Sequence, residues 1–231
     1  MSFVLSPPPV PSLAVAGADA RFPIRRVFCV GRNYAAHARE MGRDPDREPP
    51  FFFMKPADAV VPATGVVPYP PQTDDLHHEV ELVVALGSGG RDLSPEDVDA
   101  AIWGATVGID LTRRDLQAEA KAAGRPWAWG KGFDAAAPMA PLVPRDRVPT
   151  LTQGPIWLEV DGKRRQEGDL SEMIWPVREH VAIISRSMTL APGDLVMTGT
   201  PAGVGSLDPG ARVRAGIDGL AELSFEMGAR P

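Results

Sequence analysis

The sequence predicts an α+β fold in which strands dominate and helices are few and short. The 25 prolines and 23 glycines are spread between short apolar runs, a distribution typical of many strands joined by turns. Two pairs, Asp161-Gly162 and Asp218-Gly219, each separate two runs with strand character. Such pairs tolerate the positive φ of tight hairpin turns. No internal repeat or dividing linker is visible, so we expect one domain.

Each expected element follows from local patterning. Runs rich in β-branched and apolar residues predict strands at 27–30, 51–54, 79–86, 102–110, 156–160, 195–198, 212–217 and 220–225. Helices are predicted at 33–41, 95–101, 116–123 and 176–188. Asn33 and Ser94 are the expected N-caps of the first two helices, and Gly124 ends the third. The fourth opens at Pro176 and carries an apolar face that we expect to pack on a sheet.

Composition narrows the class of protein. With 44% hydrophobic and 23% charged residues, the chain has the make-up of a soluble globular protein. A net charge of −6 argues against nucleic acid or an anionic membrane as partner. A small anionic substrate is still compatible with this charge if the binding site is locally positive. Cys29 lies in an apolar run and is expected in the core. As the sole cysteine it forms no intramolecular disulfide, so we expect a cytoplasmic location.

Targeting and membrane segments are not expected. The proline-rich start carries no basic region like that of a signal peptide, and no stretch reaches 18 uninterrupted apolar residues.

The most informative motif is Glu79-Val80-Glu81, followed by Asp110 at the end of the next long strand. In an extended strand Glu79 and Glu81 point to the same side, where two carboxylates repel unless a cation or donors neutralise them. Asp110 would complete an all-oxygen site suited to Mg²⁺ or Mn²⁺. From the pattern alone, a strand with one solvent-facing side explains the alternation better.

Two further groups have chemical potential and ordinary alternatives. His37 and Glu40 are three residues apart on a predicted helix, where the carboxylate can orient the imidazole as a general base; an exposed pair is the simpler interpretation. Lys131 lies between glycines and tryptophans and could stabilise an oxyanion. Equally, its stem could pack on Trp129 with the ammonium in solvent.

Arg113 and Arg114 follow Asp110, and one of them could clamp a substrate carboxylate; a surface ion pair is the alternative. The glycine-rich segment 198–205 lacks the lysine and the helix of a P-loop, which argues against nucleotide binding. Its backbone N–H groups and threonine hydroxyls could bind a carboxylate instead, although a plain turn is as good an interpretation.

The residues of these motifs and their order along the chain resemble those of the fumarylacetoacetate hydrolase family. The segments that carry the resemblance are Val30-Gly31-Arg32-Asn33-Tyr34, His37 with Glu40, Phe53-Met54-Lys55-Pro56, His78-Glu79-Val80-Glu81, Asp110 to Asp115, Lys131-Gly132-Phe133 and Thr198-Gly199-Thr200-Pro201. The resemblance covers about residue 22 to the end. It implies a single catalytic domain over 22–231 after an N-terminal extension of 1–21, as in members that consist of the catalytic domain only.

The resemblance also implies a fold and a set of roles. The fold would be the mixed β-sandwich or β-roll of the fumarylacetoacetase C-terminal domain, in a homodimer. Mg²⁺ or Mn²⁺ would be bound by Glu79, Glu81 and Asp110. His37 and Glu40 would form the water-activating dyad, and Lys131 would be the active-site lysine. Arg114, Gln117 and Thr200 fall at positions associated with the substrate.

The expected activity is metal-dependent hydrolysis of the C–C bond of an acylpyruvate, a small anionic 2-oxo acid. Fumarylpyruvate is the preferred candidate, because the sequence as a whole is most similar to those of bacterial members assigned that role in aromatic catabolism. The alternatives are oxaloacetate decarboxylation, or isomerisation or decarboxylation in homoprotocatechuate breakdown, through the same metal-enolate chemistry. A non-catalytic binding module is a third hypothesis, opposed by the presence of His37, Glu40 and Lys131. Tyr69, Trp127 and Trp129 are candidate pocket-lining residues.

Overall fold

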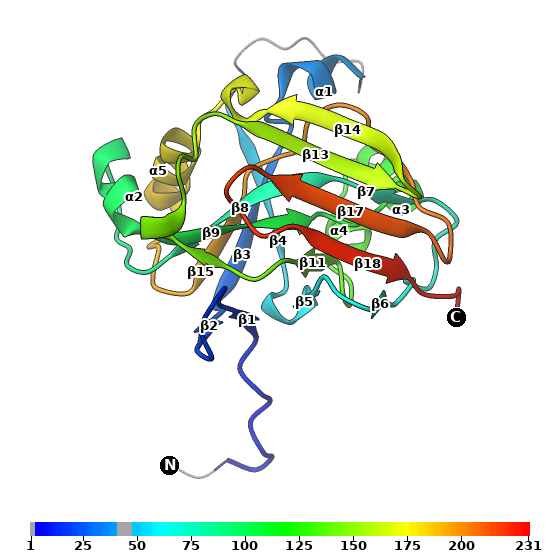
Figure 1. Cartoon of the computed structure of the whole chain (residues 1–231), viewed down its shortest axis with the longest axis horizontal. Helices are drawn as coiled ribbons and strands as arrows, with labels where there is room; N and C mark the ends of the chain where they lie inside the picture. The colour runs from blue at the N-terminus through cyan, green and yellow to red at the C-terminus, as the bar shows by residue number, and fades with distance from the viewer. Residues whose placement is uncertain (1–2, 41–47) are drawn as a thin grey trace.

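A computed structural model shows two stacked sheets with short helices at their edges (Figure 1). It describes residues 3–40 and 48–231, with the side chains of 38–40 outside the described part. The larger sheet has the order β4 (Phe51–Lys55), β3 (Arg26–Gly31), β15 (Asp194–Met197), β8 (Val80–Leu86), β9 (Ile102–Ile109), β11 (Ala137–Met139), β5 (Val60–Pro62), and β12 (Val143–Pro144) pairs with β9. It is mixed, because β3 runs parallel to β15 while β8 runs antiparallel to both β15 and β9.

The second sheet lies across the first. Its order is β14 (Lys163–Asp169), β13 (Pro155–Val160), β17 (Arg212–Ile217), β18 (Leu223–Met227) and β6 (Val66–Val67). A small sheet of β10 (Thr112–Arg113), β7 (Leu76–His78) and β16 (Gly205–Ser206) continues beside β8, and β1 (Ser12–Ala14) pairs with β2 (Arg21–Pro23). This strand-dominated, curled architecture confirms the predicted fold class.

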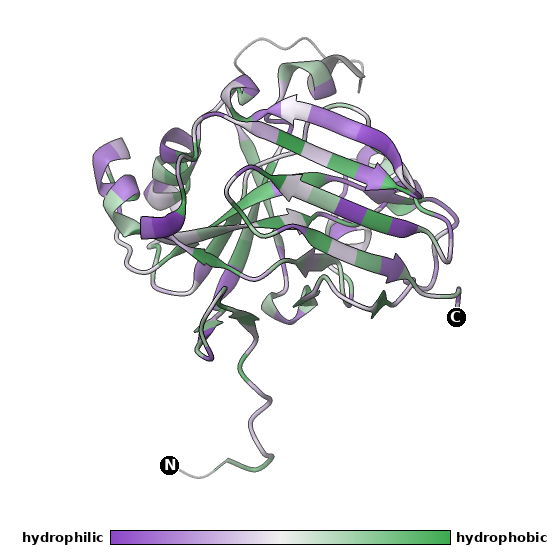
Figure 2. Ribbon diagram, in the orientation of Figure 1, coloured by the Kyte–Doolittle hydropathy of each residue, from purple (hydrophilic) through white to green (hydrophobic). Residues whose placement is uncertain are grey.

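The main hydrophobic core lies between the two sheets. It joins Leu82 of β8 and Val107 of β9 with Leu158 of β13 and Val213 of β17, all of them fully buried. Burying an aliphatic side chain of this size contributes roughly 1.5–3 kcal/mol, so this layer supplies much of the folding free energy. In Figure 2 the strands of the larger sheet are mostly hydrophobic, whereas β14, at the edge of the second sheet, is hydrophilic along most of its length.

The helices are α1 (Ala35–Glu40), α2 (Pro95–Ala101), α3 (Arg114–Ala122), α4 (Ala128–Lys131) and α5 (Val177–Ser187), with 3-10 turns at Ala57–Ala59, Arg145–Arg147 and Leu170–Glu172. Ser94 caps α2 in a reciprocal capping box with Asp97, as predicted. Helix α5 buries Val177, Val181 and Ile184 in the main core, also as predicted. No helix among the described residues is long and apolar enough to span a membrane.

Every predicted long strand is present, with shifts at some ends. The 79–86 strand begins at Val80, and the last begins at Leu223 rather than Leu220, because the Asp218-Gly219 connection is longer than a two-residue turn. The Asp161-Gly162 turn has the positive φ angles of 52° and 72° that were expected. The strands missed outright, such as β7, β10 and β16, have two or three residues, which is too short for an alternation signal.

Asn33 is not an N-cap: its amide donates to the carbonyl oxygens of Trp175 and Thr198 and accepts from the Trp175 N–H. Met41, the predicted end of that helix, lies outside the described residues.

The boundary between the N-terminal extension, 1–21, and the catalytic domain stays a prediction. Residues 12–23 form the β1–β2 hairpin, and Leu13 and Val15 pack in a second apolar cluster with Cys29, which is buried as expected.

Candidate active site

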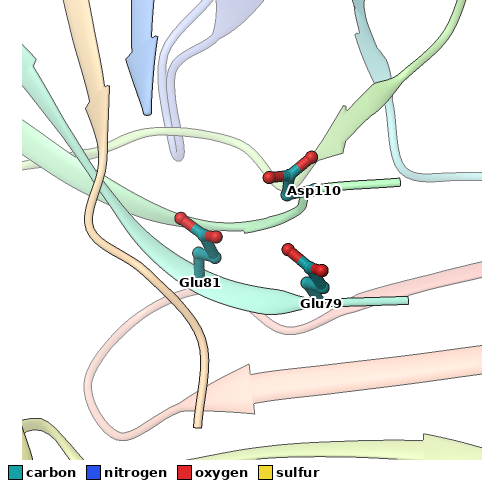
Figure 3. Close-up of side chains that lie close together, drawn as sticks. All are labelled: Glu79, Glu81 and Asp110. Carbon is teal, nitrogen blue, oxygen red and sulfur yellow. The ribbon is translucent and has the colours of Figure 1, made fainter. Parts of the chain in front are cut away.

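Three carboxylates meet where β8 and β9 lie side by side. Val80 pairs with Ile109, so Glu79 just before β8 lies next to Asp110 just after β9, and the Asp110 N–H donates to the Glu79 carbonyl at 2.8 Å. Glu81 follows on the same side of β8. Figure 3 shows the three side chains turned toward one another, and one oxygen of each lies within 4.8 Å of the others. The antiparallel register therefore brings the motif and Asp110 together.

The cluster is buried, which excludes the interpretation of a solvent-facing strand. Glu79, Glu81 and Asp110 are 6%, 1% and 0% exposed, and all of β8 is buried. Burial, reinforced by Asp110 and Glu79, raises the pKa of Glu81 well above its usual range. Burial also raises the pKa of Glu79, but Lys131 and Arg114 outweigh it and lower that pKa. Cations therefore neutralise Glu79 and Asp110, whereas Glu81 has no cationic partner among the described residues.

Lys131 at the end of α4 bridges two of the acids. Its Nζ donates to Glu79 Oε2 at 2.8 Å, to Asp110 Oδ2 at 2.7 Å and to Thr112 Oγ1 at 2.6 Å. The alternative of an ammonium in solvent is wrong, since the residue is 2% exposed. Burial lowers the pKa of Lys131, but Asp110 and Glu79 more than offset this and raise it, which keeps the ammonium charged.

A second lysine, Lys55 at the end of β4, was not predicted as a site residue. Its Nζ is fully buried, lies 2.8 Å from Asp110 Oδ1, and donates to the carbonyl oxygens of Leu111 and Lys131 at 3.0 and 2.6 Å. Lys55 thus holds the backbone that carries two site residues. The sequence signal is a lysine at the end of an apolar run and before a proline, where a solvated lysine is equally common.

Helix α3 supplies the residues next to the acids. The Arg114 guanidinium pairs with Glu79 Oε1, donates to Gln117 Oε1 at 2.5 Å, and donates through Nε to His77 Nδ1 at 3.3 Å. Arg113 lies elsewhere, with its guanidinium over the ring of Phe133. As predicted, one arginine of the pair faces the site.

His37 of α1 is 6% exposed and lies on the wall of the pocket. The backbone of Glu40 closes the same helix, but its side chain lies outside the described residues, so the His37–Glu40 dyad stays a prediction.

The loop after β15 forms another wall. The Gly199 N–H donates to Glu81 Oε2 at 2.8 Å, so it is not free to bind a ligand as the sequence suggested. Gly199 has a φ of +93°, and an added Cβ would lie 2.7 Å from Asn33 Cβ, which explains the glycine. Thr200 is buried and lines the pocket, and its hydroxyl accepts from Gln166 at 2.7 Å.

These residues line a small cavity of about 50 Å³. The described residues around it include every predicted site residue except Glu40 and Asp110, and Asp110 is fully buried against Lys131. Arg32, Phe53 and Lys121 are further lining residues. Of the three aromatic residues expected to line the pocket, Trp127 does so. Trp129 is 78% exposed, and Tyr69 is buried beside Arg230, away from the acids.

The donor set fits a hard divalent cation. Carboxylate oxygens are the ligands that Mg²⁺ and Mn²⁺ prefer, and here three converge. Asp110 Oδ1 is buried with the Lys55 ammonium 2.8 Å away, and Glu81 has no cationic partner among the described residues. A buried acid without a cation beside two other acids is what a cation site offers.

The model of the fumarylacetoacetate (FAA) hydrolase C-terminal domain matches residues 26–227. The chain belongs to the fumarylacetoacetate hydrolase family. Among solved structures, fumarylpyruvate hydrolase from Pseudomonas aeruginosa in complex with Mn²⁺ and pyruvate is 50% identical, with a TM-score of 0.96, over 99% of this chain and 100% of that chain. The resemblance that the motifs suggested is confirmed.

Other members of the family carry different activities. The mitochondrial oxaloacetate decarboxylase of Dictyostelium discoideum is 40% identical over 88% of this chain and 94% of its own length. A mitochondrial oxaloacetate tautomerase of Arabidopsis thaliana is 42% identical over 89% of this chain and 92% of its own length. Family membership therefore establishes the fold and the class of chemistry, and the choice of substrate needs a further argument.

Proposed function

We propose that this family member hydrolyses the C–C bond of an acylpyruvate, with fumarylpyruvate as substrate and fumarate and pyruvate as products. The observation that carries the proposal is the buried cluster of Glu79, Glu81 and Asp110 in a chain 50% identical, over nearly its whole length, to a fumarylpyruvate hydrolase solved with Mn²⁺ and pyruvate. The same proposal places the reaction in the breakdown of aromatic compounds.

Charge supports a doubly anionic substrate. The three acids of the cluster are matched in number by three cationic groups, those of Lys55, Lys131 and Arg114, which pair with Glu79 and Asp110. A divalent ion added to this balanced set leaves the buried site positive, which favours a ligand with two carboxylates at this depth. Fumarylpyruvate has one carboxylate at each end.

We assign the metal and proton chemistry as follows. Glu79, Glu81 and Asp110 would hold Mg²⁺ or Mn²⁺, which supplies Lewis-acid stabilisation of negative charge on the substrate oxygens. An imidazole nitrogen of His37 takes a proton from water as the water oxygen bonds to the distal carbonyl carbon. The bond from that carbon to the adjacent methylene then breaks, and its electron pair passes to the pyruvate fragment. The proton on His37 returns to that fragment, and the new carboxylic acid releases its own proton to solvent.

The remaining residues bind and orient. The ammonium of Lys131, already fixed by Glu79 and Asp110, stabilises negative charge at the reacting oxygens. Arg114, held on Glu79 and Gln117, offers its guanidinium to the substrate, and the hydroxyl of Thr200 binds the pyruvate carboxylate. We place the pyruvate end between the acids and Thr200, because Glu79, Glu81 and Thr200 line the same pocket.

Oxaloacetate chemistry is the second candidate, because curated relatives at about 40% identity act on that compound. The purified protein should be assayed with Mn²⁺ on fumarylpyruvate and on oxaloacetate, with fumarate, pyruvate and CO₂ quantified. Equal amounts of fumarate and pyruvate support the proposal, whereas CO₂ from oxaloacetate without acylpyruvate cleavage contradicts it. A His37→Ala variant should lose hydrolysis by about 10²-fold or more.

A homodimer and a cytoplasmic location remain predictions from the family resemblance and the composition. Light scattering on the purified protein checks the first, with an expected mass of twice the 24.7 kDa chain. A monomeric mass would contradict it.

A further inference from the structure

Gln166 is a fully buried polar residue on a strand whose other residues are exposed or half-buried. Strand β14 lies at the edge of the second sheet, and Gln166 reaches from it to the start of β8 and the 198–201 loop. Its Oε1 lies 3.0 Å from the Val80 nitrogen and 2.9 Å from His78 Nδ1. Its Nε2 lies 2.7 Å from Thr200 Oγ1 and 2.9 Å from the Pro201 carbonyl oxygen.

The direction of every one of these hydrogen bonds is determined. A backbone N–H only donates and a carbonyl oxygen only accepts, so Val80 requires the amide oxygen and Pro201 requires the amide nitrogen. The opposite orientation of the amide is therefore excluded. His78 Nδ1 must carry a proton to donate to Oε1, and Thr200 Oγ1 must accept from Nε2. Both lone pairs and both protons of the amide are then used.

These directions determine how the Thr200 hydroxyl is used. Its oxygen accepts a hydrogen bond from Gln166, so the hydroxyl proton needs an acceptor of its own, and the described residues offer none. Thr200 lines the pocket beside Glu81 and Lys131. The hydroxyl proton is thus left for a ligand that presents an acceptor oxygen.

We propose that Gln166 is a positioning residue that fixes the Thr200 hydroxyl as a donor to the substrate carboxylate. This inference rests on the proposed function, which places the pyruvate carboxylate at Thr200. It adds a specificity rule, because a hydroxyl held as donor favours a carboxylate over a group that can only donate.

Gln166→Glu tests the direction of the bonds with little change in size. The carboxylate can still accept from Val80, but it has no N–H for Thr200 and instead accepts the Thr200 hydroxyl proton, which turns that proton away from the pocket. Loss of one hydrogen bond to a charged ligand should weaken pyruvate binding to the Mn²⁺-loaded protein by about tenfold or more, measured by calorimetry. Mn²⁺ affinity should stay within about threefold, whereas a collapsed site would lose both ligands.

A double-mutant cycle separates orientation from simple charge repulsion. In a Thr200→Val background, Gln166→Glu should cause no further loss of pyruvate affinity, because the hydroxyl is already gone. Full loss in both backgrounds would overturn the inference. Glu167→Gln is the matched control on the exposed side of β14 and should bind pyruvate as the wild type does.

The inference can also be tested without changing Gln166, in case its variants fail to fold. Thr200→Ser keeps the hydroxyl and should keep pyruvate affinity within about threefold, whereas Thr200→Val should lose about tenfold. Equal binding by all three proteins overturns the inference. If wild-type protein neither cleaves fumarylpyruvate nor binds pyruvate, the proposed function fails and the inference fails with it. If the wild type does both and the variants match it, the inference alone is wrong.

Discussion

Lys55 illustrates how much one buried residue contributes to this site. Its ammonium neutralises Asp110 at 2.8 Å and donates to the carbonyl oxygens of Leu111 and Lys131, so it ties β4 to both the end of β9 and helix α4. Removing one partner of a buried ion pair leaves an uncompensated charge, which is far more costly than loss of a surface pair.

A Lys55→Met variant should therefore lose about 3–5 kcal/mol of unfolding free energy, measured by urea denaturation in the presence of a chelator. Lys163→Met, at the exposed start of β14, is the control and should change stability by less than about 0.5 kcal/mol. A loss below about 1 kcal/mol for Lys55→Met would contradict the role described for this lysine.

Single residues also show what could be predicted from the sequence. Glu79, Glu81 and Asp110 were found because strand alternation places the first two on one side and a return strand brings the third beside them. Lys55 and Gln166 were missed because their importance depends on burial by segments distant in the chain. Gln166 lies among charged residues of β14, and nothing local distinguishes it from its neighbours.

At the level of elements, helix α5 carries a titratable group in the core. His180 is fully buried, its Nδ1 lies 3.0 Å from the Trp175 carbonyl oxygen, and its Nε2 has no partner among the described residues. Burial, only partly offset by hydrogen bonds to the Trp175 and Pro176 backbone, lowers its pKa from 6.5 to about 4.

The resulting pH dependence has a definite sign. Between pH 6.5 and pH 4 the unfolded chain binds more protons than the folded one, so stability is complete above pH 6.5 and falls as the pH approaches 4. Over this pH interval, the loss of unfolding free energy due to His180 should be on the order of 3 kcal/mol. In urea denaturation at pH 7 and pH 4.5, His180→Gln should lose markedly less stability than the wild type across this interval. An identical loss in both proteins would show that His180 is not the group responsible.

Elements with strong local signals were predicted well, and those made by tertiary pairing were not. The N-cap at Ser94 and the turn at Asp161-Gly162 involve neighbours in the chain, so the sequence predicts them directly. Strands β7, β10 and β16 exist because they pair with one another, and no run of two or three residues has a period to detect. Asn33 has the chemistry of a cap but instead bonds to Trp175 and Thr198, distant in the chain.

In the whole molecule, the site is assembled from both sheets and from the helices at their edges. The acids lie on β8 or at the ends of β8 and β9, Lys131 comes from α4, and the support for Thr200 comes from β14 of the second sheet. These segments are distant in the chain, so only the family resemblance connects their motifs at the level of the sequence. Taken singly, each motif also fits a solvent-exposed surface residue, and the burial of the motifs around one pocket excludes that interpretation.

The N-terminal region has an exposed part and a buried part. Residues 3–10 are exposed. Leu13 and Val15, in contrast, are buried in one apolar cluster with Leu142, and Trp103 packs against this cluster. Deleting residues 1–10 should shift the melting temperature by less than about 2 °C. Deleting residues 1–21 exposes that cluster and should lower it on the order of 10 °C. Equal effects of the two deletions would contradict this division.

We expect the three buried carboxylates to hold a divalent cation that acylpyruvate hydrolysis requires. The most direct test is turnover of fumarylpyruvate by chelator-treated protein as Mn²⁺ is titrated back, comparing wild type with Glu81→Gln and with Glu226→Gln, an exposed control. Wild type and control should recover equal release of fumarate and pyruvate at the same Mn²⁺ concentration, while Glu81→Gln should need about 100-fold more. Full activity in chelator, or recovery of Glu81→Gln at the wild-type Mn²⁺ concentration, would contradict this role of the three carboxylates.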